Sequence, residues 1–107
     1  IISKGGDIDR RISLGIAGWD VNEEIVQEFG LEARTGFYID EVDRGGAASM
    51  AGLLPGDVVT GINGEMVNSY DDIKEAMRFN KVGDTIRLKV DRKGKEKDFN
   101  IKLRKGL

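Results

Sequence analysis

The chain has 107 residues, of which 39% are apolar and 34% are charged, and its formal net charge at pH 7 is -2. This length can hold one hydrophobic core and is too short for two ordinary domains. Because the chain contains neither cysteine nor histidine, its composition excludes disulfides, cysteine-ligated metals and the histidine-based nucleophilic triads of hydrolases.

The charges are unevenly distributed along the chain. Residues 1–72 carry 5 basic and 14 acidic side chains, whereas residues 73–107 carry 12 basic and 5 acidic ones. The later basic residues alternate with apolar ones or flank a turn, as on the solvated face of a hairpin, so we expect no nucleic-acid partner. No apolar run approaches the roughly 20 residues of a membrane span, so we expect no membrane insertion. No metal-ligand spacing is present, and we expect no metal and no cofactor.

The first predicted strand covers residues 12–19. It is interrupted by Gly15 and Gly18, where another backbone can approach closely. Asp20 is followed three positions later by a glutamate, a pattern that marks a helix start. An apolar stripe then predicts a helix over residues 21–29, closed by a glycine.

The middle of the chain predicts short strands separated by turns. We expect strands over residues 37–42 and 57–62, a single helical turn over 47–51, and a brief returning strand at 65–67. Asn63-Gly64 is a tight hairpin turn, because both residue types tolerate positive φ.

The last third predicts one more helix and a hairpin. A serine followed three residues later by an aspartate starts a helix over residues 69–80. Apolar and polar residues alternate over 86–91 and 99–104, around a Lys93-Gly94 turn. With fifteen glycines in the chain, this order predicts an α+β fold. It is a small, partly open barrel or sandwich of five or six short strands, capped by two or three helices.

Three sequence stretches carry a family resemblance. They are Leu-Gly-Ile-Ala-Gly at residues 14–18, Ala-Ala-Ser-Met-Ala-Gly-Leu-Leu-Pro-Gly-Asp at 47–57, and Ile-Asn-Gly at 62–64. In this order they resemble the PDZ domain of the HtrA/Deg serine proteases. The strand order is similar to the circularly permuted bacterial PDZ arrangement, and the early helix is similar to that of the HtrA/Deg subgroup. The resemblance implies a linker from a preceding protease domain at residues 1–10 and a PDZ domain at 11–105.

The resemblance implies that an extended peptide adds as a strand between the first strand and the helix at 69–80. The implied peptide-binding residues are Leu14, Gly15, Ile16, Ala17, Gly18, Tyr70, Ile73, Lys74 and Met77. The terminal carboxylate would contact the amides that open this strand, and the last side chain would enter an apolar socket.

Several of these residues have a second interpretation. Arg10 or Arg11 could support the carboxylate, or could be solvated linker residues. Leu14 and Ile73 fit the core as well as the groove, whereas the flexible Met77 favours the groove. Trp19 is expected at the surface, facing away from the socket, and we assign it no chemistry.

The implied function is peptide capture and not catalysis. The resemblance implies a parent trypsin-like serine endopeptidase of the periplasm or cell envelope, built on trimers, in which a monomeric domain captures hydrophobic C-termini or unfolded segments of misfolded proteins for quality control. Its partners would be those peptides and the protease domain of the same chain. Two alternatives stay open: a scaffold that contacts other subunits of the protease cage, and a PDZ domain of another bacterial membrane protease or secretion component.

Overall fold

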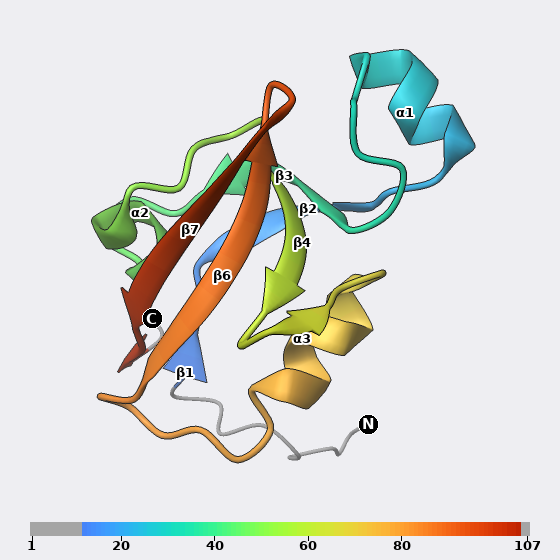
Figure 1. The fold of residues 1–107 in the computed structure, drawn as a ribbon. Coiled ribbons are helices and arrows are strands. Elements are labelled where there is room, and N and C mark those ends of the chain that lie inside the picture. Colours follow the sequence, from blue (N-terminus) through green and yellow to red (C-terminus); the bar gives the residue numbers. More distant parts are fainter. Residues whose placement is uncertain (1–11, 106–107) are drawn as a thin grey trace, which may run out of the picture.

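The computed structural model describes residues 12–105, which form short strands and three short helices around one strongly bent sheet (Figure 1). The elements are β1 (Ile12–Ser13), β2 (Ile16–Asp20), α1 (Glu23–Phe29), β3 (Phe37–Val42), α2 (Ala47–Ala51), β4 (Val58–Ile62), β5 (Glu65–Met66), α3 (Tyr70–Ala76), β6 (Thr85–Arg92), β7 (Lys95–Lys102) and β8 (Arg104–Lys105). Six strands form an antiparallel sheet in the order β2-β3-β4-β6-β7, with β5 beside β4. A separate ladder joins β1 to β8. The predicted α+β class is confirmed, and the sheet does not close into a barrel.

The longest hairpin follows the predicted alternation. Every second residue of β6 is buried, from Ile86 through Leu88 to Val90, and the residues between them are exposed or half-buried. The turn to β7 is made by Lys93 and Gly94, both with positive φ, as a two-residue hairpin of this twist requires. The solvated basic face predicted for this hairpin is therefore confirmed.

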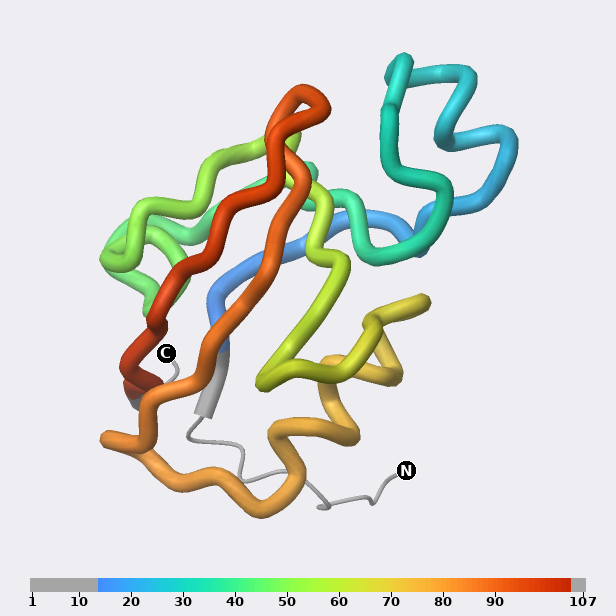
Figure 2. Tube along the Cα trace, in the orientation of Figure 1, coloured from blue at the N-terminus to red at the C-terminus, as the bar shows by residue number. Residues whose placement is uncertain are grey.

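The core has one large part and one small part. The large cluster lies between the sheet, α2 and α3, and contains residues as distant in sequence as Leu14 and Leu103. The small cluster consists of Val21, Val26 and Val58, with partly buried neighbours. Figure 2 shows why they are separate: the loop that carries α1 projects from one corner of the sheet. Therefore α1 depends on a small apolar contact of its own.

The predicted start of the first helix is wrong by two residues. The N-cap is Asn22, whose side-chain oxygen accepts a hydrogen bond of 2.8 Å from the amide of Ile25. Asp20 instead stays in β2, and its carboxylate accepts a hydrogen bond of 2.8 Å from the amide of Tyr70. Sequence spacing identifies a possible N-cap only from nearby residues. Here the Asp20 carboxylate instead bonds to Tyr70, which lies 50 positions later in the chain.

The helix predicted over residues 69–80 is shorter than expected. It ends at Ala76 with Met77 as the C-cap, and the chain continues in tighter turns, in which the amides of Arg78 and Asn80 donate to carbonyls three residues earlier. Asp84 then fixes the following loop, because its carboxylate accepts hydrogen bonds from the side chain of Asn80 and from the backbone amide of Lys81.

Candidate functional site

The path β2-β3-β4-β6-β7 ends in two edge strands, β2 and β7, which differ in how they are protected. The β7 edge carries Lys95, Lys97 and Lys102, and α2 packs against this strand. Lysines and packed helices are devices that keep a second chain from joining a sheet edge. At the other edge, β2 has no lysine, and within residues 12–105 it forms a ladder only with β3. The edge of β2 is therefore the one that a further extended segment can join.

A tight turn opens β2 and divides the strand predicted over residues 12–19 into β1 and β2. The carbonyl of Leu14 accepts a hydrogen bond of 2.9 Å from the amide of Ala48, and the carbonyl of Gly15 accepts one of 2.8 Å from the amide of Asp43. The described peptide bonds contain no cis form, so the N–H that follows each carbonyl points the opposite way. The N–H of Ile16 therefore points away from β3, toward the open edge.

Helix α3 lies beside β2 and forms the other wall. Its first turn is fixed at the end of β2 by the hydrogen bond from the amide of Tyr70 to Asp20 and by the rings of Tyr70 and Phe37, whose centroids are 5.0 Å apart. From there the helix runs back toward the level of β1 (Figure 1). The loop after it is held by a hydrogen bond of 2.9 Å from the amide of Gly83 to the carbonyl of Leu103, next to β8. Helix α3 and strand β2 thus lie side by side, and the surface between them is called the groove below.

The structure gathers the predicted residues at this groove but divides them into two layers. Leu14, Ile73 and Met77 are at most 5% exposed and belong to the main core. Met77 is therefore a core residue, contrary to its interpretation as a flexible wall. Ile16 is half-buried against that core, and the remaining predicted side chains, those of Ala17, Tyr70 and Lys74, are exposed.

Backbone conformation and contacts within the domain explain why glycine stands at positions 15 and 18. Gly15 has a φ of 74°, and a Cβ there would lie 3.3 Å from both Asp43 Cβ and Gly46 Cα. A Cβ on Gly18 would overlap the carbonyl oxygen of Tyr38 in β3. The close backbone approach predicted from the sequence is confirmed, and the approaching backbone is the domain's own. Arg10 and Arg11, the predicted carboxylate supports, lie outside the described residues.

Trp19 has no role predicted from sequence patterns. It is 54% exposed, which confirms its predicted surface position, and it lies opposite Tyr38 in the β2–β3 ladder. Tyr38 in turn stacks on Phe29 of α1, with ring centroids 4.4 Å apart. The indole therefore stands at the open edge beside a fixed pair of aromatic rings.

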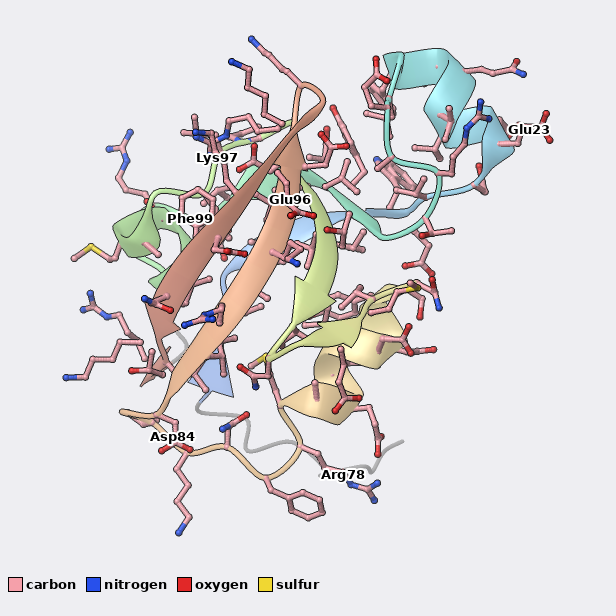
Figure 3. All side chains as sticks on the ribbon, viewed as in Figure 1. Glu23, Arg78, Asp84, Glu96, Lys97 and Phe99 are labelled. Atoms are coloured by element: carbon pink, nitrogen blue, oxygen red, sulfur yellow. The ribbon has the colours of Figure 1, made fainter. Side chains whose placement is uncertain are left out.

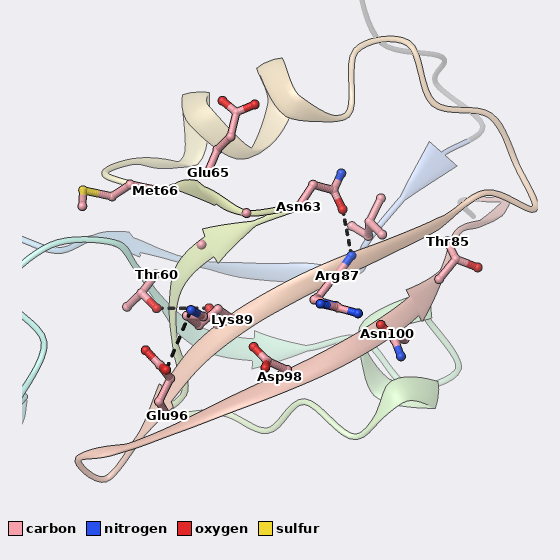
Figure 4. A pocket seen from close by; sticks show the side chains of 13 residues that line it. Thr60, Asn63, Glu65, Met66, Thr85, Arg87, Lys89, Glu96, Asp98 and Asn100 are labelled. Carbon is pink, nitrogen blue, oxygen red and sulfur yellow. Dashed lines mark hydrogen bonds and ion pairs between the residues drawn. The ribbon is translucent and has the colours of Figure 1, made fainter.

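A shallow hollow elsewhere on the molecule offers no rival site. It lies on the solvent face of β4, β5, β6 and β7 (Figure 4), and some of its polar groups pair with one another. Lys89 Nζ lies 3.8 Å from a Glu96 carboxylate oxygen, and the amide of Arg87 donates to the side chain of Asn63 over 2.9 Å. None of the predicted binding residues lines it. We interpret it as a solvated sheet face.

Two classes of site receive no support from residues 12–105. No group of acidic side chains there is arranged to hold a metal ion. No helix in the same part of the chain is both long and apolar enough to cross a membrane.

Comparisons with known sequences agree on one family. A sequence model of the PDZ domain family matches residues 13–103. The chain is 35% identical over 94 residues to the probable periplasmic serine protease do/HhoA-like of Haemophilus influenzae, covering 88% of this chain and 20% of that protein. It is 30% identical over 98 residues to the periplasmic pH-dependent serine endoprotease DegQ of Escherichia coli, covering 92% and 21%. The chain spans about a fifth of the length of these curated relatives.

Solved structures give the same fold. The HtrA-type protease AlgW with a decapeptide superposes with a TM-score of 0.81 at 25% identity, over 91% of this chain and 30% of that one. The HtrA3 PDZ domain bound to a phage-derived ligand, FGRWV, superposes with a TM-score of 0.77 at 21% identity, over 89% of this chain and 86% of that one. Both of these related structures contain a bound peptide.

Proposed function

Since this chain belongs to the PDZ domain family, we propose that it binds the C-terminal segment of a peptide as an added strand along β2. The family prediction made from the motifs is confirmed: the domain closely resembles the PDZ domains of HtrA, DegP and DegQ proteases. The observation that carries the proposal is the contrast between the two sheet edges. The β7 edge carries three lysines, and the β2 edge carries none.

The proposed binding mode uses the three parts of the groove. The peptide backbone pairs with the open edge of β2, and its terminal carboxylate accepts a hydrogen bond from the N–H of Ile16. The last side chain lies against Ile16, over a floor of Leu14, Ile73 and Met77. An apolar last residue is favoured, because each methylene that it buries contributes about 0.8 kcal/mol.

The proposed role extends to the parent protein. The domain captures hydrophobic C-termini or unfolded segments and delivers them to a trypsin-like serine endopeptidase of the periplasm, for protein quality control. Support comes from the curated relatives, several of which are named periplasmic serine endoproteases. The chain spans only about a fifth of those relatives, so protease activity, location and a trimer-based assembly belong to the proposal and not to this domain alone.

A calorimetric titration of the 107-residue chain tests the binding mode. Peptides that end in an apolar residue are compared as the free acid and as the C-terminal amide. We expect saturable binding of the acid and at least tenfold weaker binding of the amide, because a hydrogen bond to a charged group is worth about 1.5–3 kcal/mol. Equal affinities would contradict carboxylate recognition and indicate binding of internal segments. Failure of both forms to bind would favour the scaffold role.

A substitution in the groove complements this titration. Met77 is a poor choice, because a polar residue at a core position 5% exposed would unfold the domain. Ile16→Thr keeps a β-branched side chain in the strand but removes apolar surface from the groove. Val82→Thr is the matched control, because Val82 is 48% exposed and lies in the loop after α3. We expect a severalfold loss of affinity for the first variant only.

A further inference from the structure

We infer that the groove selects peptides that carry a lysine or arginine three residues before the C-terminal residue. The inference rests on the proposed peptide-binding function and adds a class of ligand to it. Three independent features point to it: an acidic end of the groove, a basic end, and the exposed indole of Trp19 between the path of the peptide and the rings of β3 and α1.

The acidic end lies where β2 finishes and α3 begins. The hydrogen bond from the amide of Tyr70 to Asp20 brings these two element ends together. Asp71 follows at once on α3, where it pairs with Lys74 over 3.3 Å, and Glu23 and Glu24 form the exposed first turn of α1, a few residues beyond Asp20. These four carboxylates outnumber the one lysine, and an exposed charge acts over about a Debye length of 10 Å, so they attract a cation placed among them without touching it.

The basic end lies where α3 finishes and β2 begins. Lys81 is exposed in the segment after α3, and Arg104 is exposed in β8, which pairs with β1. Arg78 is also exposed there, and it pairs with Glu75 over 3.1 Å. The hydrogen bond from Gly83 to Leu103 holds these segments together. Figure 3 shows the separation of charge, with Glu23 on α1 and Arg78 beyond the far end of α3. A peptide with a terminal carboxylate at the basic end therefore places its upstream residues at the acidic end.

The direction and spacing of an added strand decide which residue meets Trp19. With its carboxylate at Ile16, the peptide runs antiparallel to β2, and both strands rise about 3.3 Å per residue. Trp19 follows Ile16 by three positions and points to the opposite face, so the facing residue is the third before the C-terminal one. Directly opposed residues of antiparallel strands project from the same face. The facing side chain therefore lies against the indole.

An exposed indole beside a cluster of carboxylates favours a cation. Trp19 is 54% exposed, and its ladder partner Tyr38 is held by Phe29, so the ring has a supported position. A lysine or arginine over a tryptophan face is attracted by the ring quadrupole. The alkyl stem of the same side chain covers apolar ring surface while its charge stays in water. A glutamate at that position would gain neither contact and would be repelled by the acidic end.

The test is a peptide series with one apolar C-terminal sequence and lysine, norleucine or glutamate at the third residue before the C-terminal one. At low salt we expect the lysine peptide to bind about threefold to tenfold more tightly than the norleucine peptide. We expect the glutamate peptide to bind most weakly, and the spread to narrow at high salt as the charges are screened. Equal binding of all three, with norleucine bound, would overturn the inference and leave the proposed function standing. No binding of the norleucine peptide would overturn both.

Two variants locate the effect. Trp19→Leu keeps an apolar side chain at a half-exposed strand position and removes the ring. Asp20→Asn removes a charge and keeps an oxygen that can accept from the amide of Tyr70. The control, Asp98→Asn, makes the same charge change on the solvent face of β7. We expect the first two variants to reduce the preference for lysine while norleucine binding is retained, and the control to leave it unchanged. A full lysine preference in Trp19→Leu and Asp20→Asn would overturn the assignment.

Discussion

Arg92 and Asp57 join two distant parts of the chain through a buried ion pair. Asp57 is 1% exposed, and its two carboxylate oxygens each accept a hydrogen bond of 2.7 Å from the Arg92 guanidinium. The guanidinium also donates to the carbonyl of Gly52 over 3.0 Å and lies 5.2 Å from the ring centre of Phe99. The hydrogen bonds to Asp57 raise the pKa of Arg92. The pair fixes the loop after α2 to the end of β6.

Removal of Arg92 leaves this carboxylate buried without its cation. We expect Arg92→Met to lower the free energy of unfolding by about 3 kcal/mol, because breaking a buried pair from one side leaves an uncompensated charge. Urea denaturation measures the change. The control is Lys89→Met, which breaks an exposed pair with Glu96 at 3.8 Å and is expected to cost less than about 1 kcal/mol. Similar losses in the two variants would contradict a special role for Arg92.

Asp84 gives the domain a pH-dependent contribution. Hydrogen bonds from the amide of Lys81 and from the side chain of Asn80 hold the pKa of Asp84 below its usual value. A pKa that is lower in the folded state stabilises the fold above the unfolded-state pKa, and this stabilisation is lost as the pH falls through the folded-state pKa. We expect Asp84→Asn, which cannot titrate, to be less stable than the wild type at pH 7 and to approach it as the pH falls below the ordinary aspartate pKa of about 3.9. A stability difference that stays constant across this range would contradict the assignment.

At the scale of elements, β2 is positioned by close contact with β3. The ladder shifts register between Ala17 and Gly18, and Gly18 is the residue that lets the two backbones approach. The turn before β2 is fixed by hydrogen bonds to Asp43 and Ala48, residues that sequence patterns alone do not connect to it. The binding edge therefore depends on β3 and α2 as much as on its own residues.

Gly18→Ala tests this dependence. Since a Cβ there would overlap the Tyr38 carbonyl, we expect a loss of about 3 kcal/mol or more in the free energy of unfolding, and a loss of peptide binding. The control is Gly61→Ala in β4, where the nearest atom to a Cβ is 3.3 Å away and the expected cost is about 1 kcal/mol. Thermal and urea denaturation measure both variants. A fully stable Gly18→Ala domain would show that β2 can move away from β3.

At the scale of the whole molecule, the uneven charge of the sequence becomes a spatial arrangement. The lysines of the second half protect the β7 edge and the hairpin that leads to it, whereas acidic residues surround the end of β2 and the start of α1. Although the net charge is close to zero, one edge of the sheet is therefore basic and the other lies near acidic residues. One edge is closed to further strands, and the other is open and attracts cations.

Local patterns determined most of the secondary structure. The strand at Phe37–Val42 and the helix at Ala47–Ala51 have the predicted bounds, and both two-residue hairpin turns are present. These predictions are correct because alternation and turn chemistry act over a few residues. The motifs also identified the family, because together they cover most of the chain.

The sequence by itself therefore determined most of the elements and the family. Only the tertiary structure decided that Met77 belongs to the core, that Asp20 joins α3 and does not cap α1, and that Trp19 stands at the open edge. The physical reason is that burial and hydrogen-bond partners depend on contacts between residues far apart in the chain. Spacing along the sequence predicts on which face of a helix or strand a residue lies, but it does not predict which distant residue packs over it.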